Sequence, residues 1–184
     1  YPNFHSGTER ELEETFERFK KLCGNDDIEF LGYYEENKLK GCLIYFWFNM
    51  NFHGEMIKAV GIGGVAVDLL YKKEKIAQKL IKYSLNYAKT NNMTLFMLYP
   101  FNAKFYRNFG FGYGKQISLY RAKPEHFKNF GDKSKLRYIS NEEIDKIIKF
   151  YNNRVKYKHG MMEKTSIEEF KMKNSSNVRT IVFE

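Results

Sequence analysis

The chain has 184 residues, of which 43% are hydrophobic and 17% aromatic, and its formal net charge is +9. That length can bury one good core, or one domain and part of another, and no apolar run approaches the roughly 20 residues that a membrane-spanning helix needs. Because the lysines are spread along the chain, we expect a soluble protein with ordinary surface charge and without a nucleic-acid or membrane partner.

The first 50 residues predict a helix followed by an antiparallel hairpin. Thr8-x-x-Glu11 is a capping-box pattern, and apolar residues then recur at helical spacing, which predicts a helix from about Glu9 to Leu22. Aromatic and β-branched residues dominate Ile28–Tyr34 and Leu39–Asn49, and a short polar stretch separates them. These two segments are therefore predicted to pair as antiparallel strands.

A glycine-rich segment comes next. Met56–Ala59 is expected to extend the sheet, and Val65–Leu69 is predicted to be the central strand. The intervening Gly61-Ile62-Gly63-Gly64 weakens regular pairing and favours a bulge or sharp bend. A dinucleotide-binding glycine motif must follow a strand and open a helix, whereas these glycines precede a strand, so we discount NAD binding.

A helix and a second strand follow the central strand. Residues 76–88 place apolar side chains on one broad helical face, and the lysines lie mostly elsewhere. Such a helix can return the chain to a parallel strand at Thr94–Leu98, which gives a right-handed βαβ unit. Asn102–Asn108 predicts a short helix that Gly110 ends, and Gly112–Arg121 predicts a further strand.

The composition changes near Pro124. Asn129–Ser134 has the character of a linker. The motifs Ser140-x-x-Glu143 and Ser166-x-x-Glu169 are each expected to cap a helix, and Val178–Phe183 predicts a strand. The C-terminal third is therefore expected to begin a second structural unit.

Isolated polar residues give little direct evidence of chemistry. Cys23 and Cys42 lack the spacing of a zinc site, so we expect buried free thiols and no metal. His5 and His53 could act as bases, but single histidines in aromatic surroundings are usually structural. The first residues lack the basic and apolar regions of a signal peptide, which favours a cytoplasmic location.

The order of strand, basic helix, strand and short aromatic helix from Gly61 to Gly114 resembles the acetyl-CoA-binding half of a GNAT-fold N-acetyltransferase. The glycine-rich strand entrance, Tyr99-Pro100 and the ending Phe105-Tyr106-x-x-Phe109-Gly110-Phe111 resemble the Eis-like (enhanced intracellular survival) family. This resemblance implies an α/β (α+β) fold with a mixed, mostly antiparallel sheet around a central parallel βαβ unit.

The resemblance also implies a domain organisation. Residues 1–123 correspond to an N-terminal GNAT domain without its first strand and helix. Residues 124–184 correspond to a linker and the incomplete beginning of a second GNAT-like domain. Eis-like proteins form oligomers, which makes a homo-oligomer one of the expected states.

The function implied by the resemblance is transfer of an acetyl group from acetyl-CoA to a primary amine. Aminoglycosides, polyamines and lysine side chains are the expected acceptors. A GNAT-fold binding or assembly module with weak or lost CoA binding is the alternative. The hypothesis of a nucleic-acid-binding domain rests on the net charge alone, because the sequence shows no helix-turn-helix, RNP or zinc pattern.

The resemblance assigns the CoA phosphates to the start of the helix after the central strand, where backbone amides attract anions. Its pattern is Arg/Gln-x-x-Gly-x-Gly/Ala, and Lys75 stands where glycine is usual. Lysine disfavours the φ angles that glycine accepts, so lysine side chains are expected to help as counter-charges. A solvated helix start is the alternative interpretation. The matching residues are Lys72, Lys73, Glu74, Lys75, Ile76 and Ala77.

The remaining assignments concern pantetheine and the leaving group. The backbones of Val65, Ala66 and Val67 are expected to face pantetheine where the sheet splays. Tyr106 matches the tyrosine that lies beside the CoA sulfur and protonates the leaving thiolate, although an aromatic at helical spacing is otherwise a core residue. Asn102 bonds the cofactor or caps the short helix, and capping is favoured. The sequence does not identify a general base.

Overall fold

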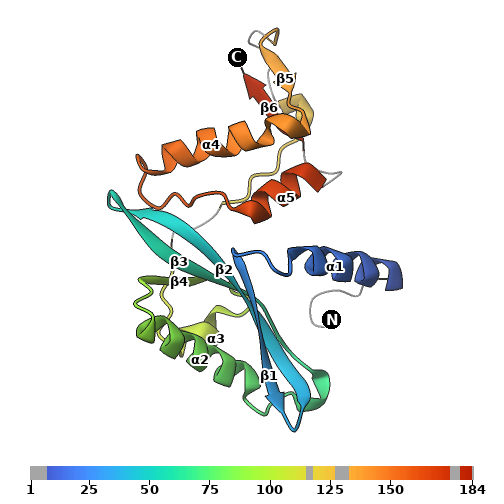
Figure 1. Cartoon of the computed structure of the whole chain (residues 1–184), viewed down its shortest axis with the longest axis vertical. Coiled ribbons are helices and arrows are strands. Elements are labelled where there is room, and N and C mark those ends of the chain that lie inside the picture. Colours follow the sequence, from blue (N-terminus) through green and yellow to red (C-terminus); the bar gives the residue numbers. More distant parts are fainter. Residues whose placement is uncertain (1–7, 115–117, 127–132, 175–178, 184) are drawn as a thin grey trace.

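The computed structural model describes residues 8–114, 118–126, 133–174 and 179–183. Its main body is a four-stranded sheet in the order β1-β2-β3-β4 (Figure 1). The first three strands pair antiparallel, and β4 pairs parallel with β3. The mixed, mostly antiparallel sheet with a parallel βαβ unit is therefore confirmed. The strands are β1 (Ile28–Glu35), β2 (Lys38–Phe52), β3 (Glu55–Val67) and β4 (Leu95–Leu98).

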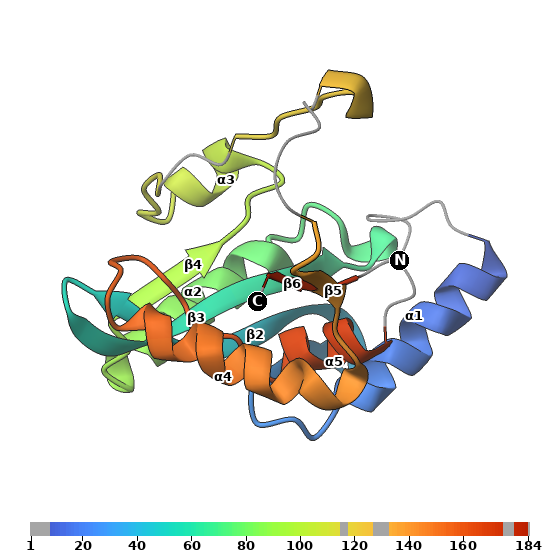
Figure 2. The ribbon, with the colours of Figure 1, turned by 90° about the horizontal axis from the view of Figure 1, so that it is seen from above.

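Helices cover both faces of this sheet (Figure 2). On one face, α2 (Ile76–Thr90) and α3 (Ala103–Arg107) pack against a core formed mainly by β2 and β3. On the other face, α1 (Glu9–Leu22) and α5 (Ser166–Asn174) share a smaller apolar cluster with β1 and β2. The helix α4 (Ile144–Val155) lies beside α5.

The N-terminal elements form as predicted because their signals are local. The Thr8 hydroxyl accepts a hydrogen bond from the Glu11 amide, and the Glu11 carboxylate accepts one from the Thr8 amide at 2.7 Å. This reciprocal cap satisfies two donors that a helix N-terminus otherwise leaves open. The β1–β2 hairpin is also confirmed, and β2 continues three residues beyond its predicted end.

The glycine-rich segment is part of one continuous strand, so the separate strands predicted on either side of it are wrong. A Cβ atom on Gly63 would lie 2.7 Å from the Phe46 ring, and one on Gly61 would lie 3.3 Å from the Phe48 ring. These glycines therefore make room for aromatic side chains of β2. Gly64 has φ +58° at a register shift of the β2–β3 pairing, which confirms the predicted bulge.

The bulge is followed by a sharp change of direction. The strand ends at Val67, whereas the sequence predicts that it reaches Leu69. Residues Leu69–Tyr71 form a short 3₁₀ turn, which begins where the Asp68 carboxylate accepts a hydrogen bond from the Leu70 amide at 2.8 Å. This turn leads the chain from the sheet to the start of α2.

The C-terminal part is attached to β2 by backbone hydrogen bonds. The Gly160 amide donates to the Asn51 carbonyl at 2.8 Å, and the Asn51 amide donates to the Met161 carbonyl at 2.9 Å. The buried Asn51 side chain also donates to the Val155 carbonyl at the end of α4. Beyond this connection, β5 (Leu136–Tyr138) and β6 (Ile181–Phe183) form a separate two-stranded antiparallel sheet.

Several local predictions for the C-terminal half need correction. No strand forms in residues 112–114 or 118–121, so the predicted strand Gly112–Arg121 is wrong within the described residues. The sequence predicts that Ser166 and Glu169 cap α5. Instead, Thr165 donates its amide and hydroxyl to the Glu168 carboxylate, and the Ser166 hydroxyl donates to the Asp27 carboxylate. Most of the predicted linker, residues 129–132, lies outside the described residues.

The predicted environment of the thiols is also partly wrong. Cys23 is exposed because it follows the last turn of α1, and Cys42 is partly buried. Burial raises the pKa of the Cys42 thiol. Among the histidines, His5 lies outside the described residues, whereas His53 is exposed and its ring stacks on His159 with centroids 4.1 Å apart.

Candidate active site

The strands β3 and β4 pair over only part of their length. The parallel register joins Ala59–Ile62 to Leu95–Leu98, and β4 then ends. Val67 and Ala66 pair with β2 on one side, and no described strand lies against them on the other. The sheet is therefore open beside the last residues of β3, where the sequence predicts the backbone of Val65, Ala66 and Val67 to meet pantetheine.

The loop before α2 adopts an unusual backbone conformation. Lys73 has φ +73° and Lys75 has φ +62°, both in the left-handed region that glycine prefers. Lys75 therefore takes a glycine-like conformation in spite of its side chain. For a non-glycine residue this conformation costs about 1–2 kcal/mol. Backbone strain of this kind is concentrated at ligand-binding segments in proteins.

The first turn of α2 has no side-chain cap. Lys75 occupies the N-cap position and makes no capping hydrogen bond, and the first helical bond runs from the Lys79 amide to the Lys75 carbonyl at 2.9 Å. The amides of Ile76 and Ala77 therefore have no hydrogen-bond acceptor within the helix. Lys72, Lys73 and Lys75 are all exposed around this turn. Uncapped amides and positive charge together favour an anion at the helix start.

A close contact fixes this helix start against the sheet. Ile76 is 2% exposed and packs over Gly41 of β2. A Cβ atom on Gly41 would lie 2.8 Å from Cγ2 of Ile76 and 3.0 Å from the carbonyl oxygen of Ala66. The first turn of α2 therefore lies directly beside the end of β3 because residue 41 has no side chain.

The helix α3 carries the predicted catalytic tyrosine. The Asn102 carboxamide oxygen accepts a hydrogen bond from the Phe105 amide at 3.2 Å, which makes Asn102 the N-cap of α3. Tyr106 is 4% exposed, and its ring packs edge-on against Phe101 and Phe111. Burial raises the pKa of the Tyr106 phenol. The hydroxyl therefore stays protonated at neutral pH and is available as a proton donor.

The hydrophobic core brings predicted site residues from three elements together. Val65 and Val67 of β3, Ile76 of α2 and Tyr106 of α3 belong to one apolar cluster. The lysines and Glu74 of the loop remain at the surface beside it. A basic, exposed loop and a buried phenol are thus held on the same rigid framework.

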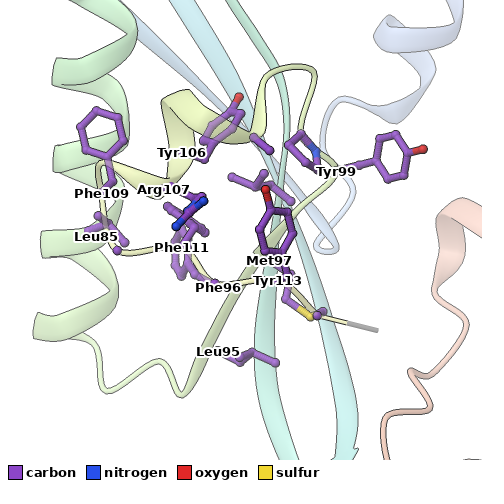
Figure 3. Close-up of a pocket in the computed structure, with 16 residues that line it drawn as sticks. Leu85, Leu95, Phe96, Met97, Tyr99, Tyr106, Arg107, Phe109, Phe111 and Tyr113 are labelled. Carbon is purple, nitrogen blue, oxygen red and sulfur yellow. The ribbon is translucent and has the colours of Figure 1, made fainter. Parts of the chain in front are cut away.

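Sequence reasoning missed a large cavity next to Tyr106. It has a volume of about 1080 Å³ and lies between β4, α3 and the segment that follows α3 (Figure 3). Tyr106 is the only predicted site residue among its lining residues. All of its described lining residues lie between Leu85 and Gly114, but the space among them depends on how β4, α3 and the segment after α3 fold back on one another, so no short motif signals it. Its lining residues are Leu85, Leu95, Phe96, Met97, Leu98, Tyr99, Pro100, Ala103, Tyr106, Arg107, Phe109, Gly110, Phe111, Gly112, Tyr113 and Gly114.

Two further properties concern only the part of the chain that the structure describes. In that part, no group of three or more His, Cys, Asp or Glu side chains is placed to hold a metal ion. No helix there is both long enough and apolar enough to cross a membrane.

The mixed sheet, its parallel βαβ unit and the open edge beside the end of β3 define an α/β domain. Residues 4–114, more than half of the chain, match the family described as the acetyltransferase (GNAT) domain. The chain therefore belongs to the GNAT acetyltransferase domain family, whose acetyl donor is acetyl-CoA. No curated protein sequence matches the chain.

Solved structures show the same fold. A conserved protein of unknown function and probable N-acyltransferase from Enterococcus faecalis V583 aligns with a TM-score of 0.67 at 20% identity, over 98% of this chain and 45% of that protein. The chain thus spans less than half of that relative. A predicted acetyltransferase from Clostridium acetobutylicum, solved with acetyl-CoA, aligns with a TM-score of 0.51 at 14% identity, over 65% of this chain and 79% of the other.

Proposed function

We propose that the chain transfers the acetyl group of acetyl-CoA to a primary amine, as an N-acetyltransferase of the Eis-like family. The observation that carries this proposal is the start of α2. There, uncapped amides and exposed lysines adjoin the open end of β3. With its pyrophosphate bound at this helix end, a CoA molecule would extend along β3 toward Tyr106.

The residues of the loop have separate roles in binding. The amides of Lys75, Ile76 and Ala77 bind the pyrophosphate, and Lys72 and Lys73 supply counter-charge. Lys73 and Lys75 have left-handed backbone angles, and turns that contain such residues can form anion-binding concavities. Glu74 is the one acidic residue of the segment, and its exposure leaves its carboxylate free to point into solvent.

The remaining residues position the reaction. The backbone of Val65, Ala66 and Val67 pairs with pantetheine as an added strand would. The neutral amine attacks the thioester carbonyl carbon, the carbon–sulfur bond breaks, and the thiolate takes the Tyr106 proton. The proton that the amine loses passes to water. Asn102 acts through α3, whose first turn it caps.

The wider assignments follow the Eis-like resemblance. The acceptors that this resemblance implies are aminoglycosides, polyamines or lysine side chains. We propose residues 1–123 as the catalytic GNAT domain and residues 124–184 as a linker and the beginning of a second GNAT-like domain, with a cytoplasmic location. The contacts of Asn51 with the C-terminal part agree with a second unit that is fixed to the first.

Acetyl-CoA binding tests the proposal directly. We expect calorimetry to detect binding, and amide chemical shifts to change at residues 65–67 and 73–77. Dephospho-CoA lacks the 3′-phosphate, and 4′-phosphopantetheine and pantetheine form a matched pair that differs by one phosphate of the pyrophosphate. Binding confined to another surface, or equal binding of acetyl-CoA and pantetheine, would contradict the phosphate site. Undetectable binding would favour a GNAT-fold assembly module without catalysis.

A further inference from the structure

The cavity beside Tyr106 has a mainly apolar, aromatic wall. Phe96 of β4 and Phe111 and Tyr113 of the segment after α3 gather on one side of it, whereas the Tyr99 side chain points away from them (Figure 3). Its volume of about 1080 Å³ is at the upper end of the usual range for small-molecule sites. The cavity is therefore large enough for a molecule with a bulky apolar body.

The charge of the cavity is positive. Among the described residues that line it, none is acidic and Arg107 is the single charged one. The Arg107 guanidinium lies 5.9 Å from the centre of the Tyr113 ring, and the described residues place no carboxylate in an ion pair with it. Such a wall disfavours an acceptor with several positive charges and favours one with a negative group.

The described wall of the cavity also offers no base. No carboxylate or imidazole is among the described lining residues, so an acceptor bound against them must arrive with its amine already neutral. At pH 7 about one in seven peptide α-amino groups is neutral, against about one in 2,500 lysine-like amines. The supply of neutral amine in solution is therefore several hundred times larger for α-amino groups than for alkylamines, which favours an α-amino acceptor at a site without a base.

We propose that this cavity is the acceptor site, and that it takes a short peptide with a free α-amino group on a large apolar residue and a carboxylate that pairs with Arg107. The inference rests on the proposed acetyl transfer, because Tyr106 lies in the cavity wall. It selects an acceptor class that differs from polycationic aminoglycosides and polyamines.

Two dipeptides form a matched pair of probes. Phe-Glu and Phe-Lys, both with an amidated C-terminus so that only the Glu side chain supplies a carboxylate, share the amine and the aromatic side chain and differ in the charge of the second residue. Calorimetry with the full chain in excess CoA should show Phe-Glu binding about fivefold more tightly or better, as expected for one exposed charge pair. Arg107→Glu should reverse this preference. Lys104→Glu is the matched control, because it makes the same charge change on an exposed residue of α3 that lies outside the cavity.

Product formation separates the two proposals. With acetyl-CoA, mass spectrometry should detect N-acetyl-Phe-Glu in preference to N-acetylspermidine. Faster acetylation of spermidine, or a dipeptide preference that Arg107→Glu leaves unchanged, overturns the acceptor assignment while the acetyltransferase proposal stands. Charge-selective binding of Phe-Glu without acetylation of any amine supports the cavity as a peptide site and overturns the proposed catalysis.

Discussion

The two ends of the candidate site are built in opposite ways. At one end, the loop Lys72–Lys75 is exposed, and Lys73 and Lys75 hold a left-handed backbone. At the other end, Tyr106 is 4% exposed and sits in an aromatic cluster. The loop offers backbone amides at the cost of local strain, whereas the tyrosine offers one hydroxyl held by close packing. Substitutions at the two ends should therefore separate binding and stability from chemistry.

The largest effect should come from Tyr106→Phe, which keeps the ring and removes the hydroxyl. We expect kcat to fall by about 10²- to 10⁴-fold, the range for a lost general acid, with the lower end favoured because water can substitute. Acetyl-CoA affinity and the free energy of unfolding should change little, because the packing surface is retained. Steady-state kinetics under conditions where chemistry limits kcat, with calorimetry and urea unfolding, measure all three.

The pH dependence of the wild-type enzyme gives an independent check on the same hydroxyl. Burial raises the pKa of Tyr106, so the proton donor persists through neutral pH and is lost only as pH rises above its ordinary value near 10. The fall in kcat caused by its ionisation should therefore begin only at strongly alkaline pH and be absent from Tyr106→Phe. Turnover by this variant at the wild-type rate would return Tyr106 to the role of a core aromatic.

The next largest effect should come from Gly41→Ala, which disturbs the contact between the start of α2 and the sheet. In Gly41→Ala the new methyl group meets Ile76 and the Ala66 carbonyl oxygen, so the start of α2 must shift from β3. Overpacking of this kind costs about 1–3 kcal/mol of unfolding free energy, and acetyl-CoA affinity should fall with it. Gly112→Ala is the stability control, since its methyl group enters open space. Equal unfolding midpoints for the two variants in urea would contradict the tight contact.

The sequence predicts elements well where their signals are local. The helix Glu9–Leu22 has its predicted bounds because its cap and apolar spacing lie within the same 15 residues. The strand β3 was misread because Gly61 and Gly63 resemble breaks, although they accommodate the Phe46 and Phe48 rings. The need for small residues at these positions comes from the neighbouring strand, so the sequence of the glycine segment alone does not indicate it.

The candidate site, like the fold, was predictable only in part from the sequence. The order of the elements predicts that Tyr106 and the start of α2 share one framework, and the core cluster joins them. The left-handed backbone of Lys75 contradicts the intrinsic preference of lysine, so only the folded chain reveals it. Arg107 was also missed, because β4 and the segment after α3 meet around it only in three dimensions.

The smallest effect, and the most direct test of the strained loop, is Lys75→Gly. Glycine accepts φ +62° without a steric penalty, so the free energy of unfolding should rise by about 1 kcal/mol. Lys72→Gly removes the same charge at φ −59°, where glycine relieves no strain and loosens the unfolded chain, so it should lower stability slightly. Acetyl-CoA affinity should fall modestly and to a similar extent in both, and added salt should weaken the wild type more than either variant. Urea unfolding and calorimetry measure these changes. A clear gain in acetyl-CoA affinity for Lys75→Gly would show that the lysine impairs the phosphate site, and would favour a decayed binding module over an adapted enzyme.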